Sequence, residues 1–366
     1  MAETLKRTPF YDLHVAAGAK IVPFAGFEMP VQYPTGITAE HNAVRKCAGL
    51  FDVSHMGEFE VAGPDAVAFA SHVTSNDATA LAVGQVQYSC FLHESGGMVD
   101  DCLVYRFTDR VMLVVNASNI QKDWAHINRF AAKFDVKLAD RSDETALLAL
   151  QGPRAQAVLQ PLTPAVDLET VPYYWFTIGE VAGVACIISR TGYTGEDGFE
   201  LYHSPDDSRA LWDALVANPD VTLTGLGARD SLRLEVAYPL YGNDVDDETS
   251  PLEAGLGWIV KLKKPDFVGK EALVAQKSYG LTRKLIGFQL IEKGFPRHGM
   301  PVYASGERSG EVRSGTVSPS TGAAIGTAYL PAAHAARGTR FEIDIRGKRV
   351  GAEVVETPFW KGGSRR

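Results

Sequence analysis

The stretch "ESGGMVDDCLVYR", residues 94–106, places two adjacent carboxylates inside an apolar run. In an extended strand successive side chains point to opposite faces, so Asp101 shares one face with Leu103 while Asp100 lies on the other. Both faces are otherwise apolar, which predicts a strand covered on both sides. Because an ionised carboxylate in such a strand is costly unless it is paired, the two acids need a structural or chemical reason.

The simplest structural reason is a turn at Gly96 and Gly97 that is capped by one of the acids. This interpretation accounts for Asp100. It leaves Asp101 on the opposite face, without an explanation.

The surrounding sequence predicts a mixed α+β unit. Three strands are expected at 85–92, 98–106 and 110–116. One helix is expected near Pro64, and a second is expected behind a capping-box pattern formed by Ser118 and Gln121.

Outside this unit the sequence alternates between short strands and helices. Strands are expected at 146–151 and 183–190, and helices at 39–48, 205–217, 225–235 and up to about residue 277. The last 85 residues differ, with short alternating strands punctuated by glycine and a hairpin around Gly347. This part predicts a small all-β barrel or sandwich.

Composition limits the class of protein. The chain has 366 residues, 45% of them hydrophobic, and a net charge of -8, which suits two or three domains and disfavours a nucleic-acid-binding protein. No apolar run approaches the roughly 18 residues of a membrane span, and the start of the chain has no apolar signal core. A cytoplasmic location is therefore expected. The four cysteines form no CxxC pair and are expected to be buried thiols, and no metal site is expected.

Several common catalytic motifs are absent from the sequence. "FVGKEAL" lacks the glycine spacing and hydroxyl residue of a P-loop, and "GLGARD" is not a dinucleotide fingerprint. No G-x-S-x-G and no H-E-x-x-H occurs. The usual nucleotide, hydrolase and zinc functions are therefore not supported.

Four other stretches place polar residues in apolar, glycine-rich contexts: "GGMVDDCLVYR", "VVNASN", "SRTGYTGEDGFELY" and "GLGARDSLRLEVAYPLYGND". In the third, Glu200 lies between Phe199 and Leu201 in a predicted strand, where a solvated loop acid is not expected. In the fourth, Arg229 and Glu235 are as readily explained by surface ion pairs on a helix. A carboxylate in an apolar slot suits a ligand that offers paired N–H donors, such as the amidine-like edge of a pterin.

The same stretches closely resemble the aminomethyltransferases, or T-proteins, of the glycine cleavage system. The resemblance runs over nearly the whole chain, in the order "TPFYDLH", "FDVSHMGEFEV", "GGMVDDCLVYR", "VVNASN", "ALQGP", "SRTGYTGEDGFELY", "GLGARDSLRLE", "LYGND", "PLEAGLGWIV" and "FVGKEAL". Ten ordered matches make this a specific signal.

The resemblance implies three domains arranged as a cloverleaf around a central folate cavity. A discontinuous core domain would comprise residues 1–52 and 139–280, an inserted α+β domain residues 53–138, and a C-terminal β-barrel residues 281–366. Tetrahydrofolate is the implied cosubstrate, and the methylamine-loaded lipoyl arm of H-protein is the other substrate. The implied products are 5,10-methylene-tetrahydrofolate, ammonia and the dihydrolipoyl carrier.

The resemblance also assigns residues to the site. Asp101 matches the catalytic aspartate, which would orient the reacting groups and stabilise a cationic iminium. Asn116, Glu200 and Arg229 match folate-contacting positions, and Glu200 would accept two hydrogen bonds from the pterin. The positions expected to line the cavity are Met56, Tyr88, Val114, Tyr173, Tyr193 and Tyr238. The C-terminal "TPFWKGGSRR" diverges from the family pattern, so no site residue is assigned there.

Two alternatives and one docking hypothesis accompany this assignment. A folate-binding iron–sulfur assembly factor would carry K-G-C-x-x-G-Q-E where this chain has "RTGYTGEDGFE". A folate-dependent demethylase of the same fold is the other alternative; the match at Asp101 and the lack of a fused flavin domain favour the T-protein. Basic stretches at 261–264 and 364–366 are candidate contacts for an acidic carrier protein, and solvated surface lysines explain them equally well.

Overall fold

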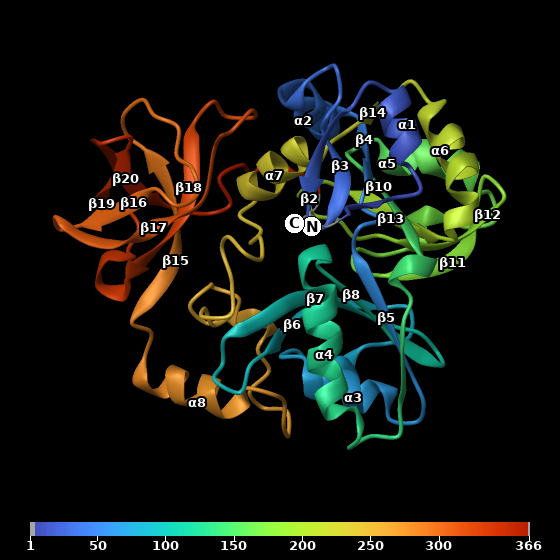
Figure 1. The fold of residues 1–366 in the computed structure, drawn as a ribbon, viewed down its shortest axis with the longest axis horizontal. Helices are drawn as coiled ribbons and strands as arrows, with labels where there is room; N and C mark the ends of the chain where they lie inside the picture. The colour runs from blue at the N-terminus through green and yellow to red at the C-terminus, as the bar shows by residue number, and fades with distance from the viewer. Residues whose placement is uncertain (1–3, 365–366) are drawn as a thin grey trace.

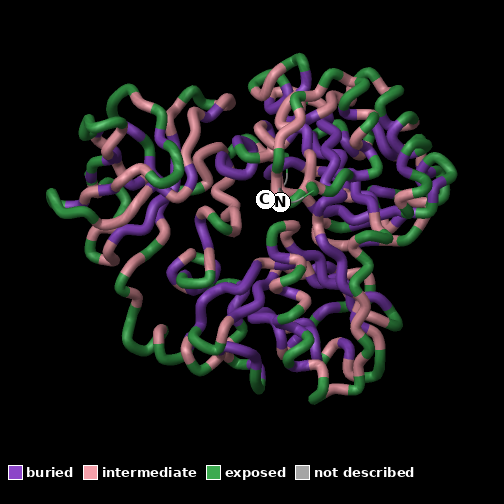
Figure 2. Tube along the Cα trace, in the orientation of Figure 1, coloured by how far each residue is buried: buried purple, intermediate pink, exposed green. Residues whose placement is uncertain are grey.

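Three large sheets, each with its own core, form three lobes in the computed structural model, which describes residues 4–364 (Figure 1). Figure 2 shows buried segments running through each lobe, with exposed segments concentrated at the periphery. This arrangement confirms the predicted α+β class with a C-terminal barrel. No helix in the described part of the chain is long and apolar enough to cross a membrane.

The first lobe is built on a six-stranded sheet that is covered on both faces. Strand β10 shows why, because its run "ALLALQ" has no polar face: Leu148 and Leu150 belong to one core cluster, and Leu147 and Ala149 belong to another. The strands, in spatial order, are β11 (Phe176–Val181), β12 (Val184–Ser189), β13 (Gly198–His203), β10 (Ala146–Gln151), β4 (Ala48–Asp52) and β14 (Val221–Leu223).

Helices and a small N-terminal sheet complete this lobe (Figure 1). The helices are α1 (Tyr11–Ala16), α2 (Ile37–Lys46), α5 (Ala155–Leu159), α6 (Ser208–Val216) and α7 (Leu226–Glu235). The small sheet contains β1 (Lys6–Arg7), β3 (Phe27–Gln32) and β2 (Lys20–Phe24), in that order.

The second lobe contains the acidic pair. Its five-stranded sheet has the order β6 (Val86–Leu92), β7 (Met98–Arg106), β8 (Arg110–Val115), β5 (Gly57–Ala62) and β9 (Lys137–Asp140). Helices α3 (Ala66–Val73) and α4 (Ile120–Ala131) pack on one face, around Phe59, Val104 and Ile127. The opposite face is left for the cavity. The predicted capping box is wrong, because α4 begins after Asn119 without a side-chain cap.

The third lobe is a closed barrel, as the alternating C-terminal sequence predicted. Its hairpin pairs Ile343 with Val350, and Gly347 supplies the positive φ of +83° that the turn needs. The strands, in order around the barrel, are β15 (Arg283–Leu290), β18 (Ala324–Pro331), β17 (Glu307–Val317), β16 (Pro301–Ala304), β19 (Arg340–Ile345) and β20 (Lys348–Val355). Helix α8 (Lys270–Tyr279) precedes the barrel in the chain, and its Leu273 packs with Leu92 and Met98 of the second lobe.

The domain boundaries inferred above stay a prediction. The two larger sheets draw their strands from residues 48–52 with 146–223 and from residues 57–140, and the barrel uses residues 283–355. The polypeptide thus leaves the first lobe after β4 and returns to it at β10.

Candidate active site

A cavity of about 820 Å³ lies where the three lobes meet, and all three contribute to its wall. Phe51 and Arg229 come from the first lobe, Asp101 from the second, and Thr327 from the barrel. All ten residues predicted from the sequence line this one cavity: Met56, Tyr88, Asp101, Val114, Asn116, Tyr173, Tyr193, Glu200, Arg229 and Tyr238. Their roles in binding and catalysis stay predictions.

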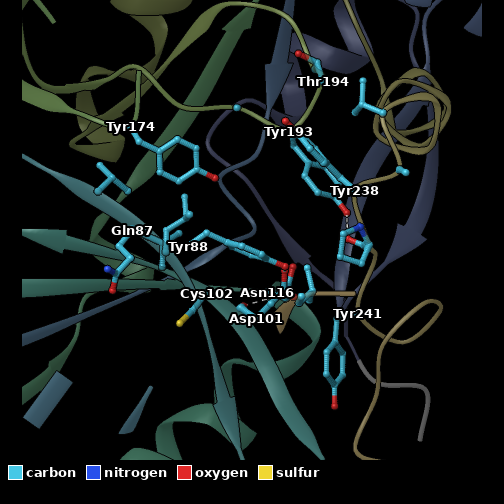
Figure 3. Close-up of a pocket in the computed structure, with 18 of the residues that line it drawn as sticks. Gln87, Tyr88, Asp101, Cys102, Asn116, Tyr174, Tyr193, Thr194, Tyr238 and Tyr241 are labelled. Carbon is cyan, nitrogen blue, oxygen red and sulfur yellow. Dashed lines mark hydrogen bonds between the residues drawn. The ribbon is translucent and has the colours of Figure 1, made fainter. Parts of the chain in front are cut away.

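Asp101 lies on the cavity face of β7, the position that the family resemblance implied (Figure 3). Its carboxylate accepts hydrogen bonds from the Tyr88 hydroxyl at 2.9 Å and from Asn116 Nδ2 at 2.8 Å. Removal from water and the neighbouring charge of Asp100 raise the pKa of Asp101 to about 7. The group therefore titrates near neutrality, which suits a residue that moves or stabilises a proton.

Asp100 points the other way and is fully buried. It accepts hydrogen bonds from the Asn116 backbone N–H at 3.0 Å and from Asn119 Nδ2 at 2.7 Å. Asn116 Nδ2 also reaches it at 2.9 Å, so one amide group bridges both aspartates. Asp100 thus ties the start of α4 to the strand.

The predicted capping of the Gly96–Gly97 turn by Asp100 is wrong. The turn is closed by backbone hydrogen bonds, from His93 N–H to the Gly97 carbonyl and from Gly96 N–H to the His93 carbonyl, each at 2.9 Å. Gly97 is needed for space, since a Cβ atom there would lie 1.9 Å from the Asp247 carbonyl oxygen. The two glycines therefore serve close packing and the turn, independently of the acids.

Glu200 lies on β13, opposite Ala149 of β10, and accepts a hydrogen bond from the Thr191 hydroxyl. Burial raises its pKa, and the Thr191 hydrogen bond and Arg229 lower it in part. Thr191 belongs to a buried hydroxyl network that the sequence analysis missed. In that network Tyr105 and Tyr202 share a hydrogen bond of 2.9 Å. The network fixes Glu200 in the wall and leaves it without an ion-pair partner among residues 4–364.

Arg229, from the first turns of α7, is the cation of the cavity. Its guanidinium lies 4.7 Å from the ring centroid of Tyr193, which stacks on Tyr238 at 5.7 Å. It makes none of the ion pairs found in the described part of the chain. The surface ion pairs that the sequence allowed for Arg229 and Glu235 are not found, because Arg229 forms no ion pair within residues 4–364 and Glu235 is buried and pairs with Arg45 at 2.8 Å.

Some cavity residues gave no clear signal in the sequence. Trp258 is 61% exposed and packs against Tyr88, with ring centroids 5.9 Å apart. Thr357 and Pro358 of the C-terminal segment also line the cavity. A tryptophan beside glycine in "GLGWIV" is only a weak signal, because its exposure is visible in the structure alone, and the C-terminal contacts depend on how the barrel packs.

The docking hypothesis for the basic stretches stays a prediction, but it does not extend to every lysine: Lys261 and Lys263 are exposed, whereas Lys264 is not. Lys264 is buried and donates to the carbonyl oxygens of Ser71, Thr74 and Asn76 at 2.5 to 2.6 Å, so it is not available to a partner. Of residues 364–366, the last two lie outside the described residues. Ser364 donates to Glu196 at 2.7 Å and thus anchors the C-terminal segment to the first lobe.

Three lobes around a cavity that contains a few charged side chains, with a closed C-terminal barrel, define the class of one-carbon transferases built on the T-protein fold. Comparisons with known proteins give the same class. Residues 10–264 match the family model of the GCVT N-terminal domain, and residues 283–361 match that of the glycine cleavage T-protein C-terminal barrel domain.

Relatives of known name agree over the full length of the chain. The aminomethyltransferase of Symbiobacterium thermophilum is 52% identical, with all of both chains covered. That of Phocaeicola vulgatus is 50% identical over 98% of this chain and all of the relative. The crystal structure of glycine cleavage system aminomethyltransferase T from Bartonella henselae superposes with a TM-score of 0.93 at 37% identity, covering 99% of this chain. The chain belongs to the glycine cleavage T-protein family of folate-dependent aminomethyltransferases.

Proposed function

We propose that this aminomethyltransferase takes the one-carbon unit from the aminomethyl-lipoyl arm of H-protein and transfers it to tetrahydrofolate. The products are 5,10-methylene-tetrahydrofolate, ammonia and the dihydrolipoyl carrier. The observation that carries the proposal is one cavity whose wall holds an acid with a pKa near neutral, a second acid, and a guanidinium that forms no ion pair within residues 4–364.

The cavity wall fits a reduced folate in chemistry and size. Glu200 forms no ion pair within residues 4–364 and accepts one hydrogen bond, from Thr191, so it has acceptor capacity for the ring N–H and exocyclic amine of a pterin. Tyrosine rings supply an apolar, flat surface for the heterocycle. Arg229 can pair with an anionic group of the ligand. Tetrahydrofolate, when bound, supplies the nitrogen that accepts the one-carbon unit.

Asp101 is the group that we assign to the chemistry. Tyr88 and Asn116 hold its carboxylate in place from two sides, which limits its rotation before the substrates arrive. As the carbon–nitrogen bond is exchanged, positive charge develops near the transferred carbon, and a fixed carboxylate stabilises that charge. An asparagine in the same place can accept from Asn116 with its oxygen and donate its NH2 group to the Tyr88 oxygen, but it loses the charge that gives this stabilisation.

The partner is the lipoylated H-protein, whose arm reaches the cavity. Trp258 lies in the wall and is largely exposed, so it marks a side of the cavity that is open to solvent. Lys261 donates to the Trp258 carbonyl at 2.8 Å and places a charge there. A cytoplasmic location is part of the proposal, because three of the four unpaired cysteines are buried thiols and none is bridged.

The electrostatic part of carrier docking is tested by salt. If exposed charges such as Lys261 steer an acidic carrier, its binding weakens between low and physiological ionic strength, because the Debye length shortens from about 30 Å to about 8 Å. Lys261→Gln should reduce this salt dependence, and Lys277→Gln on α8, remote from Trp258 in sequence, is the matched control. Binding that does not respond to salt contradicts electrostatic docking.

The reaction is tested directly by ammonia release from methylamine-loaded H-protein. We expect release that depends on tetrahydrofolate and on the carrier, with one methylene-tetrahydrofolate formed per ammonia. A methyl sulfonium offered without carrier is the control for a demethylase, with 5-methyl-tetrahydrofolate as the product to be measured. Formation of 5-methyl-tetrahydrofolate from the sulfonium, with no ammonia from the loaded carrier, contradicts the proposal.

A further inference from the structure

Helix α4 buries an acid that the mechanism above does not use. Asp123 is fully buried and sits beneath β7 on the side away from the cavity. Within residues 4–364 no N–H or hydroxyl donor reaches either of its carboxyl oxygens. An ionised carboxylate in that position would face the full cost of desolvation with nothing to offset it.

The carboxyl of Asp100 is the group in hydrogen-bond contact with Asp123. Asp100 already accepts three hydrogen bonds from Asn116 and Asn119, so it behaves as the acceptor. Two acceptors cannot face each other without a proton between them. The proton therefore belongs on Asp123, which donates it to Asp100.

The other charged and titratable groups around the pair do not supply a counter-charge. Lys122, the neighbour on α4, donates to the Tyr241 hydroxyl at 2.7 Å and pairs with Asp247 at 3.5 Å, facing away from the acids. Cys102 and Tyr241 are neutral, since burial raises the pKa of both. Burial, followed by the charge of Asp100, raises the pKa of Asp123 to about 11. These surroundings keep the proton in the pair throughout the neutral range.

The side chain of Asn116 connects the Asp100–Asp123 pair to the cavity. Asn116 Nδ2 donates to Asp100 Oδ1 at 2.9 Å and to Asp101 Oδ1 at 2.8 Å. We propose that Asp123 is a positioning residue: as a neutral acid it donates a hydrogen bond to Asp100, and this pair, through the shared amide of Asn116, fixes the carboxylate of Asp101 toward the substrates. The proposal rests on the role assigned to Asp101.

The protonation state can be tested without any activity measurement. The infrared spectrum at about pH 8 should contain a carboxylic-acid carbonyl band that disappears in Asp123→Asn. The same band should survive in Ile127→Ala, a buried core change on the same helix. A difference spectrum without a lost band overturns the proposal, whatever reaction the protein catalyses.

The positioning role is tested by carrier-dependent ammonia release as a function of pH. Asp123→Asn keeps a neutral donor toward Asp100, so it should retain most of the turnover. The low-pH side of its pH–turnover curve, the acid limb, should not move. Asp123→Leu removes the donor, so turnover should fall about 10- to 100-fold, the worth of a hydrogen bond to a charged group. Its acid limb should move to lower pH, because Asp100 then binds a proton more readily and repels the charge of Asp101 less.

Ile127→Ala separates this role from simple loss of stability. It should lower the melting temperature as Asp123→Leu does and leave the acid limb where it is in the unchanged protein. Equal pH profiles for Asp123→Leu and Ile127→Ala contradict the proposal. Absence of folate-dependent ammonia release in the unchanged protein would instead contradict the proposed function and leave the infrared result standing.

Discussion

Two regions of this molecule contain buried charged side chains, and the partners of those side chains differ between the two regions. Where α7 meets the barrel, Arg233 pairs with Asp244 at 2.6 Å, and both side chains are fully buried. In the cavity, Asp101 and Glu200 accept hydrogen bonds from hydroxyls and an amide, and Arg229 lies over a tyrosine ring. The interface charges pair with each other inside the protein, whereas we propose that the cavity charges interact with a ligand.

The same contrast separates two glutamates near α7. Glu235 accepts from Arg45 at 2.8 Å, from Ser318 Oγ at 2.5 Å and from the Ser320 backbone N–H at 3.0 Å, joining the first lobe to the barrel. Glu200 accepts from one threonine hydroxyl. Because every oxygen of Glu235 is satisfied and Glu200 keeps spare acceptor capacity in the cavity, we propose that Glu235 is structural and that Glu200 binds the ligand.

The largest effect is expected for the acid at the chemistry. Asp101→Asn keeps shape and hydrogen-bonding capacity and removes the charge, so turnover should fall by roughly 10²–10⁴ with the melting temperature nearly unchanged. Asp100→Asn is the matched variant one residue away: it should lower the melting temperature, because it disturbs the hydrogen bonds to Asn116 and Asn119. Loss of turnover in Asp100→Asn, with an active Asp101→Asn, would move the catalytic assignment.

Breaking a buried ion pair between α7 and the barrel should lower the free energy of unfolding and leave the catalysed reaction unaffected. Arg233→Met leaves Asp244 buried without its cation, so the free energy of unfolding should drop by about 3–5 kcal/mol. Arg209→Met breaks an exposed pair with Asp213 on α6 and should cost less than about 1 kcal/mol. Urea unfolding of both variants makes the comparison. Similar losses in the two would remove the distinction between buried and exposed pairs.

The pH dependence of the free energy of unfolding should come from Glu235, at the interface between the first lobe and the barrel. Burial alone would raise the pKa of Glu235, but hydrogen bonds and charge from His41, with hydrogen bonds from Ser318 and Ser320, lower it from 4.5 to about 2. A carboxyl with a depressed folded-state pKa contributes stability that is complete above pH 4.5 and is lost as the pH falls toward 2.

The expected contribution of Glu235 is on the order of 3 kcal/mol. Unfolding free energies measured between about pH 6 and about pH 3 should therefore fall steeply in the unchanged protein and less steeply in Glu235→Gln. Parallel curves for the two proteins would show that another group carries the acid sensitivity.

The smallest effect is expected for folate binding at Glu200. Glu200→Gln replaces one charge-assisted hydrogen bond by a neutral one and turns a donor toward a donor, so tetrahydrofolate binding should weaken by about 1.5–3 kcal/mol. Calorimetry measures this affinity. Tyr202→Phe, which removes a nearby hydroxyl bonded to Tyr105, serves as the control for disturbance of the wall. An unchanged affinity in Glu200→Gln removes this residue from the proposed site.

The sequence alone could separate the two faces of strand β7, because the alternation of side chains along a strand is a local property. A period of two residues places Asp101 and Asp100 on opposite faces without knowledge of any neighbour. The family resemblance then brought in the residues from other elements, such as Arg229 and Tyr238. The structure gathers all of them around one cavity.

The features that could not be predicted from the sequence depend on contacts between segments that are far apart in the chain. Asp123 is one of several polar residues on an amphipathic helix, and its burial against Asp100 follows only from how α4 packs on β7. Lys264 had the same appearance as its exposed neighbours, and three carbonyls from the second lobe decide its burial. The pairing of Glu235 with Arg45 likewise requires residues far apart in the chain to meet.

One measurement tests the contrast between the two regions most directly: melting curves with and without tetrahydrofolate for Glu200→Gln and Glu235→Gln. We expect Glu200→Gln to melt like the unchanged protein without ligand and to lose most of the ligand-induced rise. Glu235→Gln should melt at a lower temperature without ligand and keep the full rise. If Glu235→Gln loses the rise while Glu200→Gln keeps it, the division between structural and binding acids is contradicted.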